Sequence, residues 1–306
     1  MDGFAGKLAV VTGGGSGMGR ELVRQLAAQG CSVAACDWNA SAVADTVALA
    51  QAGAPDGVRV SGHACDVSDE AQVQQFRDEL LREHAADHVD LVFSNAGIGG
   101  GASFITSSRE EWERTFAVDW WGTYYCARTF LPLLIASGDG VLVNTSSVNG
   151  FWASLGPRMP NSAYATAKFA VKGFTEALIE DLRTNAPQVR VVLVMPGHVG
   201  TDILANTRRA HGTPEPENMT AARIETAFRE KGLTAAAAAT IILDGVRSGA
   251  WRILVGEDAK ALDAAVRAKP EAAYDYAKLA MAAVKTTVEA RASNWSAAIR
   301  SLFPRD

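Results

Sequence analysis

The chain has 306 residues, of which 48% are hydrophobic and 21% are charged, and its formal net charge is −5. This composition is typical of a globular protein that buries a sizeable core. It argues against a nucleic-acid-binding surface, since phosphate binding depends on clustered lysines and arginines.

No apolar run reaches the roughly 18 residues of a membrane span, and the N-terminus lacks a charged segment followed by a long apolar one. The four cysteines form no Cys-x-x-Cys pair and lie in apolar, strand-like stretches. Reduced core cysteines of an intracellular protein have this pattern. We therefore expect a cytoplasmic protein without membrane association.

A glycine-rich run follows the first predicted strand, at 7–11, and precedes a helical pattern at 21–29. Glycines let the backbone approach a pyrophosphate closely, while the free N–H groups and positive dipole of the helix end face its charge. The run predicts a dinucleotide site, with a turn that binds no ligand as the alternative. The residues expected to bind the cofactor here are Thr12, Gly13, Ser16, Gly17, Met18 and Gly19.

The second strand, at 32–36, ends at Asp37, which lies 18 residues beyond Gly19 (37 − 19). Near this offset an acidic side chain accepts hydrogen bonds from the ribose hydroxyls of a dinucleotide. A 2′-phosphate about 4 Å from the carboxylate would be repelled by about 4 kcal/mol, and neither Ser16 nor Trp38 supplies a compensating cation. Asp37 therefore predicts NAD rather than NADP, the alternative being that it only caps the next helix.

A third strand is predicted at 58–63, followed by a charged amphipathic helix at 69–84 that Ser68 opens. His84 and His88 stand four residues apart, a spacing that can bind zinc. Because no third ligand is near in the sequence and the neighbours are charged, a solvated helix end is the better interpretation, and we expect no metal site.

A fourth strand at 89–93 runs into a second glycine-rich turn at 94–101. This turn fits the rim of the same crevice, at the carboxyl ends of a parallel sheet. Ser108 and Glu111 then form a Ser-x-x-Glu capping box, which predicts the start of a long helix at 108–134.

The fifth strand, at 141–145, delivers Ser147 to this sheet edge, and a helix predicted at 163–182 carries Tyr164 and Lys168. Four residues apart, these two side chains share one helix face. A phenol titrates near 10, and lowering its pKa by about 3 units takes about 4 kcal/mol, which a nearby cation can supply. The pair is a candidate acid/base centre, against the alternative of a chance pair on a half-exposed helix.

A sixth strand at 189–195, a helix at 235–246 and a final strand at 251–256 complete the pattern. Strands alternate with helices, which predicts right-handed crossovers and a doubly wound parallel sheet, the Rossmann fold. No proline- or serine-rich linker divides the chain, so we expect one α/β domain over residues 1–257.

Motifs along the chain resemble those of the short-chain dehydrogenase/reductase family over about residues 4 to 257. They are Thr12-Gly13-x-x-x-Gly17-x-Gly19, Asn95-Ala96-Gly97, Ser147, Tyr164-x-x-x-Lys168 and Pro196-Gly197-x-Val199-x-Thr201. The resemblance implies a metal-independent oxidoreductase with a nicotinamide cofactor. It also implies a homo-oligomer, a tetramer or a dimer.

The resemblance implies roles for the matching residues. Tyr164 would be the general acid/base, Ser147 would hold the substrate oxygen, and Lys168 would bind the nicotinamide ribose and lower the pKa of Tyr164. The remaining positions would line the cofactor cleft: Asp66 and Val67 near the adenine, then Asn95, Ala96 and Gly97, then Pro196 and Gly197, with Val199 and Thr201 at the carboxamide.

One residue departs from the family pattern. Asp119 stands where the family usually has an Asn that supports a water-mediated proton relay to the lysine. An ionised Asp119 would favour charged Lys168 and partly cancel its effect on Tyr164. We therefore expect alcohol oxidation to have an alkaline-shifted pH profile relative to an Asp119→Asn variant.

The spacing from Ser147 to Tyr164 is 17 residues (164 − 147), longer than the family pattern, which makes residues 151–160 an insertion beside these two side chains. We expect Trp152 and Met159 to form apolar walls of the substrate pocket; a surface loop whose aromatics pack on the next helix is an equal alternative. A further pocket-wall candidate is His198.

Residues 202–232 mix prolines, glycines and charges around a short helical stretch at 220–229, and the corresponding family segment is a mobile lid over the substrate. Farther on, apolar residues at helical spacing predict amphipathic helices at 276–288 and 295–303. We expect the extension at 258–306 to dock on the same or a neighbouring subunit.

These features together predict an NAD-dependent oxidoreductase for a hydrophobic or bulky secondary alcohol or ketone, such as a steroid-like, cyclic or aryl compound. A 3-oxoacyl-thioester reductase is the alternative enzyme, and Arg158, Arg208 and Arg209 could bind its carrier phosphate. Asp119 raises a third possibility, a catalytically weak dinucleotide-binding protein.

Overall fold

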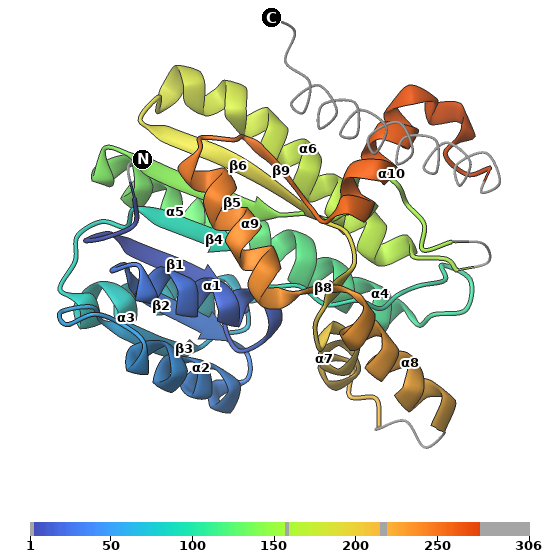
Figure 1. Cartoon of the computed structure of the whole chain (residues 1–306), viewed down its shortest axis with the longest axis horizontal. Helices are drawn as coiled ribbons and strands as arrows, with labels where there is room; N and C mark the ends of the chain where they lie inside the picture. Colours follow the sequence, from blue (N-terminus) through green and yellow to red (C-terminus); the bar gives the residue numbers. More distant parts are fainter. Residues whose placement is uncertain (1–2, 157–158, 215–218, 276–306) are drawn as a thin grey trace, which may run out of the picture.

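A computed structural model describes residues 3–156, 159–214 and 219–275 of the chain (Figure 1). At its centre is a seven-stranded parallel sheet with the strand order β3-β2-β1-β4-β5-β6-β9. The strands are β1 (Leu8–Thr12), β2 (Ser32–Asp37), β3 (Val60–Ala64), β4 (Leu91–Ser94), β5 (Gly140–Thr145), β6 (Val189–Pro196) and β9 (Arg252–Val255). The predicted doubly wound Rossmann fold is confirmed.

Helices cover both faces of this sheet (Figure 1). One layer contains α1 (Gly17–Ala28), α2 (Ala40–Ala52) and α9 (Ala235–Arg247), and the other contains α3 (Glu70–His84), α5 (Gly122–Ser137) and α6 (Ser162–Asn185). Side chains on a strand point alternately to the two faces. Along β1, Val11 accordingly packs with the α1 layer and Val10 with the α3 layer.

The sequence order of the strands reverses between β1 and β4, which are neighbours in the sheet. At such a switch point the loops that follow the two strands diverge to opposite faces and leave a crevice at the carboxyl ends. In this chain those loops are the glycine-rich turns after β1 and β4. The fold thus brings together the two turns that the sequence singled out.

The long helix predicted at 108–134 is interrupted. It consists of α4 (Arg109–Phe116), a π-helical turn η1 (Ala117–Trp121) and α5. The capping box is half correct, because the Ser108 side chain accepts a hydrogen bond from Glu111 N, whereas the Glu111 carboxylate accepts one from Gly101 N instead. Single π turns inside helices are frequent at functional sites, and this one contains Asp119.

The segment predicted as a lid is more regular than the sequence indicated. Two helices, α7 (Ile203–Ala210) and α8 (Met219–Lys231), lie beyond the sheet edge beside a two-stranded pairing of β7 (Val199–Gly200) with β8 (Leu233–Thr234) (Figure 1). The remaining elements are α10 (Glu257–Ala268) and short 3-10 turns at Val148–Gly150 and Pro270–Ala272. The amphipathic helices predicted at 276–288 and 295–303 lie outside the described residues.

Within the described ranges, no helix is long and apolar enough to cross a membrane. The same part of the chain holds no group of three or more His, Cys, Asp or Glu side chains arranged to bind a metal. His84 bonds Ser61 Oγ at 2.9 Å, and His88 bonds the neighbouring Asp87 carboxylate.

Candidate active site

A cavity of about 280 Å³ opens at the carboxyl ends of β1 and β4. Most of the predicted cofactor residues line it: Gly13, Ser16, Gly17, Met18, Gly19, Asp37, Trp38, Asp66, Val67, Asn95, Ala96, Gly97 and Thr201. Of the other predicted cofactor residues, Pro196 ends β6 and Val199 lies in β7, with Gly197 between them, and these three are not part of the cavity wall.

The two glycine-rich turns are held together by hydrogen bonds. Thr12 Oγ1 accepts from Asn95 N at 3.0 Å and from Ala96 N at 3.1 Å, and Asn95 Nδ2 donates to Thr12 O at 3.1 Å. Gly13 has a φ of +67°, and a Cβ there would lie 2.8 Å from Ala96 Cα. A side chain at this position would therefore push the two turns apart, which explains the glycine.

This cradle fits a dinucleotide. Ser16 is the N-cap of α1, but its side chain makes no capping hydrogen bond, so the helix end remains able to bind an anion. Asn95 Oδ1 is buried and has no hydrogen-bond partner among the described residues. A buried acceptor without a donor is costly, and a bound ligand at this wall would supply one.

Asp37 stands at the end of β2 with its carboxylate accepting hydrogen bonds from Gly15 N and Asn39 N, each at 3.0 Å. Burial raises the pKa of this carboxyl, and the two backbone hydrogen bonds oppose the rise. The N-cap of α2 is Asn39, whose side chain accepts from Ala42 N, so Asp37 is not the helix cap considered as its alternative role. Trp38 beside it is 46% exposed at the cavity mouth.

Asp66 forms an ion pair with Arg114, at 2.8 Å, and accepts hydrogen bonds from Ser68 N and Oγ. Burial alone would raise the pKa of Asp66, but these hydrogen bonds and the Arg114 charge outweigh it and lower the pKa. The ion pair ties the loop after β3 to α4 and holds Val67 against the helix that begins at Gly122. Two segments that are far apart in the sequence, the loop after β3 and α4, thus form this wall of the cavity.

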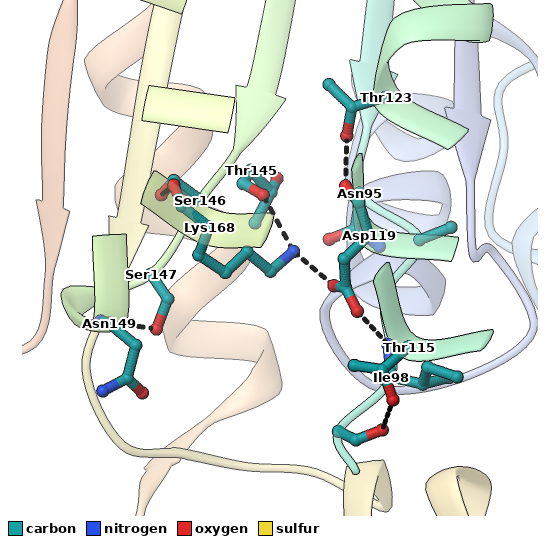
Figure 2. Close-up of polar contacts among 12 residues, drawn as sticks. Asn95, Ile98, Thr115, Asp119, Thr123, Thr145, Ser146, Ser147, Asn149 and Lys168 are labelled. Carbon is teal, nitrogen blue, oxygen red and sulfur yellow. Dashed lines mark hydrogen bonds and ion pairs between the residues drawn. The ribbon is translucent and has the colours of Figure 1, made fainter. Parts of the chain in front are cut away.

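Beyond the cavity, Lys168 from α6 reaches between β5 and the π turn (Figure 2). Its Nζ lies 2.7 Å from Asp119 Oδ1 and donates to Thr145 O at 3.2 Å. Asp119 Oδ2 accepts from Ile98 N at 3.4 Å. The lysine and aspartate side chains are 4% and 0% exposed, so this is a buried ion pair beside the turn that follows β4.

Ser147 and Tyr164 lie close to Lys168. Ser147 Oγ accepts from Asn149 N at 3.1 Å, as Figure 2 shows, and the Ser147 side chain lies close enough to the Tyr164 phenol to lower its pKa. Lys168 Nζ lies 5.4 Å from the centroid of the Tyr164 ring. The fold therefore brings together Ser147, Tyr164, Lys168 and Asp119, the four residues predicted to form the catalytic centre.

The charges in this group act on one another. Burial raises the pKa of Asp119, against the effect of Lys168. Burial alone would lower the pKa of Lys168, but Asp119 and Tyr164 outweigh it, so its pKa is raised and the ammonium is charged near neutrality. Burial also raises the pKa of Tyr164. The Lys168 charge and Ser147 lower it and the Asp119 charge raises it, and the net shift is upward.

The three predicted substrate-pocket residues lie outside the wall of the cofactor cavity. Trp152 Nε1 donates to Ala273 O at 2.8 Å, and the indole packs in a small cluster with residues of the segment after β9. Met159 is 54% exposed. His198 Nε2 bonds Phe228 O at 2.8 Å and its ring packs on the Phe228 ring. The insertion thus contacts the C-terminal segment, a contact that the sequence did not suggest.

Several cavity residues were not predicted as cofactor residues. Arg20 donates to Gly15 O at 2.6 Å, beneath the first glycine-rich turn. Asn206 and Arg209 extend from α7 into the cavity wall. No motif marked Arg20 or Asn206, and the sequence suggested Arg209 only for the carrier phosphate of a thioester. The helical pattern of α7 is only eight residues long and follows a stretch that reads as a loop.

The family model described as "short chain dehydrogenase" matches residues 7–212. The oxidoreductase SadH of Mycobacterium tuberculosis is 36% identical over 87% of this chain and 92% of its own length. The (3R)-3-hydroxyacyl-CoA dehydrogenase of Mus musculus is 35% identical over 63% of this chain and 74% of its own length.

A solved structure is similar over nearly the whole fold. The crystal structure of a short-chain dehydrogenase/reductase from Burkholderia phymatum in complex with NAD has a TM-score of 0.77 and 33% identity, covering 89% of this chain and 95% of that one. With the Tyr164 and Lys168 pair assembled beside a glycine-lined cavity, these matches show that the chain belongs to the short-chain dehydrogenase/reductase family.

Proposed function

We propose that the protein is an NAD-dependent oxidoreductase that moves a hydride between nicotinamide and a secondary alcohol or ketone. The observation that carries the proposal is the cluster of Ser147, Tyr164 and Lys168 next to a cavity lined by both glycine-rich turns. Membership of the family supports the reaction class. The Burkholderia phymatum protein, whose structure contains NAD, supports the cofactor.

The bound nicotinamide would supply the hydride acceptor for oxidation and the hydride donor for reduction. As the alcohol carbon loses its hydride, the hydroxyl proton would pass to Tyr164 Oη and the C–O bond would become a carbonyl. Ser147 would orient the substrate oxygen, because Asn149 N occupies one of its lone pairs and leaves the hydroxyl hydrogen to donate. In reduction the same proton returns from Tyr164 to the alkoxide oxygen.

Lys168 has two functions in this proposal. Its charge stabilises the phenolate that forms when Tyr164 gives up its proton. Its Nζ is paired with Asp119 Oδ1 and donates to Thr145 O, and with three N–H donors it can also donate to a ribose hydroxyl of the cofactor. Asp119 keeps the ammonium charged and in place, as a carboxylate can where the family usually has a neutral amide.

The preference for NAD rests on Asp37. Its carboxylate lines the cavity at the end of β2, where a dinucleotide places the adenosine ribose. A carboxylate there can accept from the ribose hydroxyls and would repel a 2′-phosphate. Arg20 is a cation of the described wall whose charge acts on Asp37, but its guanidinium already donates to Gly15 O and Thr46 Oγ1.

The proposed substrate is a hydrophobic or bulky secondary alcohol or ketone, with cyclic and aryl compounds first in order. Exposed apolar side chains at Phe104, Ile105, Leu155 and Met159 support this choice, since Phe104 and Ile105 follow the second glycine-rich turn and the other two precede Tyr164. Such side chains would favour an apolar substrate over a charged one.

Reduction of a 3-oxoacyl thioester is the second candidate, which the similarity to the mouse 3-hydroxyacyl-CoA dehydrogenase favours. Of the arginines expected to serve it, Arg208 pairs with Glu225 and Arg209 lines the cofactor cavity. Arg158 lies outside the described residues. These positions give the carrier phosphate less support than the sequence suggested.

A spectrophotometric screen tests the proposed function. Formation of NADH would be followed with secondary alcohols graded by size, and its consumption with the matching ketones and an acetoacetyl thioester, each repeated with NADP. We expect the highest rates with NAD and a cyclic or aryl substrate. Saturable NAD binding without turnover of any compound would favour the remaining hypothesis, a catalytically weak dinucleotide-binding protein.

A homo-oligomer and a cytoplasmic location complete the proposal. Light scattering coupled to size-exclusion chromatography measures the first, for which we expect a tetramer or dimer. Fractionation of the source cells measures the second.

A further inference from the structure

Arg209 presents a charge to the cofactor cavity that no carboxylate among the described residues neutralises. Its side chain is exposed, lines the cavity from α7 and makes one hydrogen bond within the described chain, from Nη1 to Asn206 Oδ1 at 3.0 Å. A guanidinium has five N–H donors, so most of its donors remain available to a ligand.

The contacts of Asn206 place this guanidinium close to the first glycine-rich turn. Asn206 Nδ2 donates to Ser16 Oγ at 2.9 Å, and Ser16 is the N-cap of α1. Arg209 is therefore two hydrogen bonds away from the residue that opens the phosphate-binding end of the helix. On its other side α7 holds the second turn, because Thr207 Oγ1 accepts from Gly99 N at 2.7 Å.

Other charged groups of the cavity wall are already engaged. Arg114 is paired with Asp66 at 2.8 Å, and Asp202 lies 3.3 Å from Arg229. Arg20 is held by hydrogen bonds to Gly15 O and Thr46 Oγ1 and lies near enough to Asp37 for their charges to interact. An anionic ligand that enters this cavity would find its free counter-charge at Arg209.

We propose that Arg209 binds the diphosphate of the dinucleotide and so fastens α7 over the cofactor. This inference rests on the proposed function, since it requires that the cavity hold a dinucleotide. The planar guanidinium matches the oxygens of a phosphate and can donate to two of them at once. The backbone of the first turn would hold the diphosphate from one side and Arg209 from the other.

Two other anions could be drawn to this arginine, the 2′-phosphate of NADP and the diphosphate of coenzyme A. The 2′-phosphate belongs at the ribose beside Asp37, whereas Asn206 fastens Arg209 to Ser16 at the helix end. Coenzyme A would come from the substrate side, but Arg209 lines the same cavity as the glycine-rich turn. We therefore assign the diphosphate of NAD and let the experiment separate the three.

The experiment measures dissociation constants by isothermal titration calorimetry, without turnover, for NAD, ADP-ribose, adenosine, NADP and coenzyme A. The proteins are the full chain, Arg209→Gln, Arg209→Lys and the matched control Arg208→Gln. Arg208 carries the same charge one residue earlier, but it pairs with Glu225 of α8 and does not line the cavity.

We expect Arg209→Gln to weaken NAD, ADP-ribose and NADP by about the same factor, roughly tenfold, with adenosine unchanged. Arg209→Lys should recover part of that loss, and added salt should reduce the difference between the full chain and Arg209→Gln. Arg208→Gln should bind NAD within about twofold of the full chain.

Several results would overturn the assignment. A loss for NADP alone would move the contact to the 2′-phosphate, and a loss for coenzyme A alone would move it to the substrate carrier. An equal loss for adenosine, or an equal effect of Arg208→Gln, would mean that the variant disturbs the helix and not the phosphate contact. If the unmodified chain bound no dinucleotide, the proposed function would fail as well; NAD binding that is unaffected in Arg209→Gln would refute this inference alone.

Discussion

Lys168 Nζ lies 2.7 Å from Asp119 Oδ1, and the two side chains are almost completely buried. Asp119 comes from a π turn between α4 and α5, and Lys168 from the second turn of α6. A buried carboxylate and ammonium offset each other's desolvation, and removal of one leaves the other uncompensated. In the proposed mechanism this pair sets how strongly Lys168 acts on the phenol of Tyr164.

Replacement of Asp119 by Asn should shift the pH profile of alcohol oxidation toward acid. The Asp119 carboxylate raises the pKa of Tyr164, so its removal lets the phenol ionise at lower pH. The measurement is kcat/KM for one alcohol in both proteins, from about pH 6 to about pH 10, which covers the range below the ordinary pKa of a phenol. Superimposable profiles would contradict the role given to Asp119.

Gly97→Ala should disturb the ion pair directly. A Cβ at this position would lie 2.7 Å from Asp119 Oδ1 and 3.2 Å from Lys168 Nζ, and both residues are buried. We expect a loss of about 1–3 kcal/mol in unfolding free energy, the usual cost of overpacking, together with a fall in kcat.

The matched control is Gly173→Ala, on the exposed side of α6, where an added Cβ would meet nothing within 4 Å. It should raise the unfolding free energy by about 0.5–1 kcal/mol, because alanine favours a helix interior over glycine. Equal unfolding free energies and equal kcat values for the two variants would contradict the predicted clash of the added Cβ with Asp119 and Lys168.

Asp37→Asn should relax the cofactor preference. At a near-surface dielectric the repulsion of a 2′-phosphate is about 4 kcal/mol, and solvent at the cavity mouth reduces it. We expect the ratio of kcat/KM for NAD to that for NADP to fall by about 10- to 100-fold. Asp45→Asn, which removes the same charge from the exposed side of α2, should leave the ratio unchanged.

Asp263→Asn should destabilise the attachment of α10 to the sheet. Asp263 accepts from Arg252 Nη1 at 3.0 Å, Arg252 Nη2 at 2.6 Å and Arg267 Nε at 2.9 Å. Burial alone would raise the pKa of this carboxyl, but the two arginines outweigh it and lower the pKa. A loss of about 1–2 kcal/mol in unfolding free energy at pH 7 is expected.

The same variant gives a pH dependence with a defined sign. Because the folded-state pKa of Asp263 lies below its unfolded value of about 3.9, its stabilisation is present above that pH and disappears as pH falls through the folded-state pKa. The difference between the two proteins in denaturant titrations should therefore shrink below about pH 4. Asp244→Asn, at a pair 37% and 63% exposed, is the control and should change little.

Much of the fold followed from the sequence because its signals are local. Short apolar strands such as 32–36 and 89–93 end in glycine or polar turns, and the alternation of strands with helices leaves few topologies. The π turn could not be predicted, since residues 108–134 keep a helical pattern throughout and no residue in them marks a break. The helix α2, which Asn39 caps, was expected only as the helix that follows Asp37, without bounds.

The site could be predicted from the sequence where the interacting residues belong to one short motif. Tyr164 and Lys168 share a helix face at a spacing of four, and the glycine-rich turn directly follows β1. The contact of Lys168 with Asp119 joins residues 49 positions apart (168 − 119), so the sequence could offer it only as a departure from a family pattern. The place of Arg209 in the cofactor cavity and the attachment of Trp152 to the C-terminal segment depend on tertiary packing, which no local spacing encodes.

The central claim is that Tyr164 exchanges the proton in a hydride transfer to NAD, and Tyr164→Phe tests it most directly. The change removes one hydroxyl, while the glycine-rich turns and Lys168 remain. The measurement pairs calorimetric NAD binding with stopped-flow NADH formation from the best alcohol of the screen. We predict an NAD dissociation constant within about threefold of the unmodified protein and a rate lower by at least about 10³-fold; unchanged NADH formation with intact NAD binding would contradict the claim.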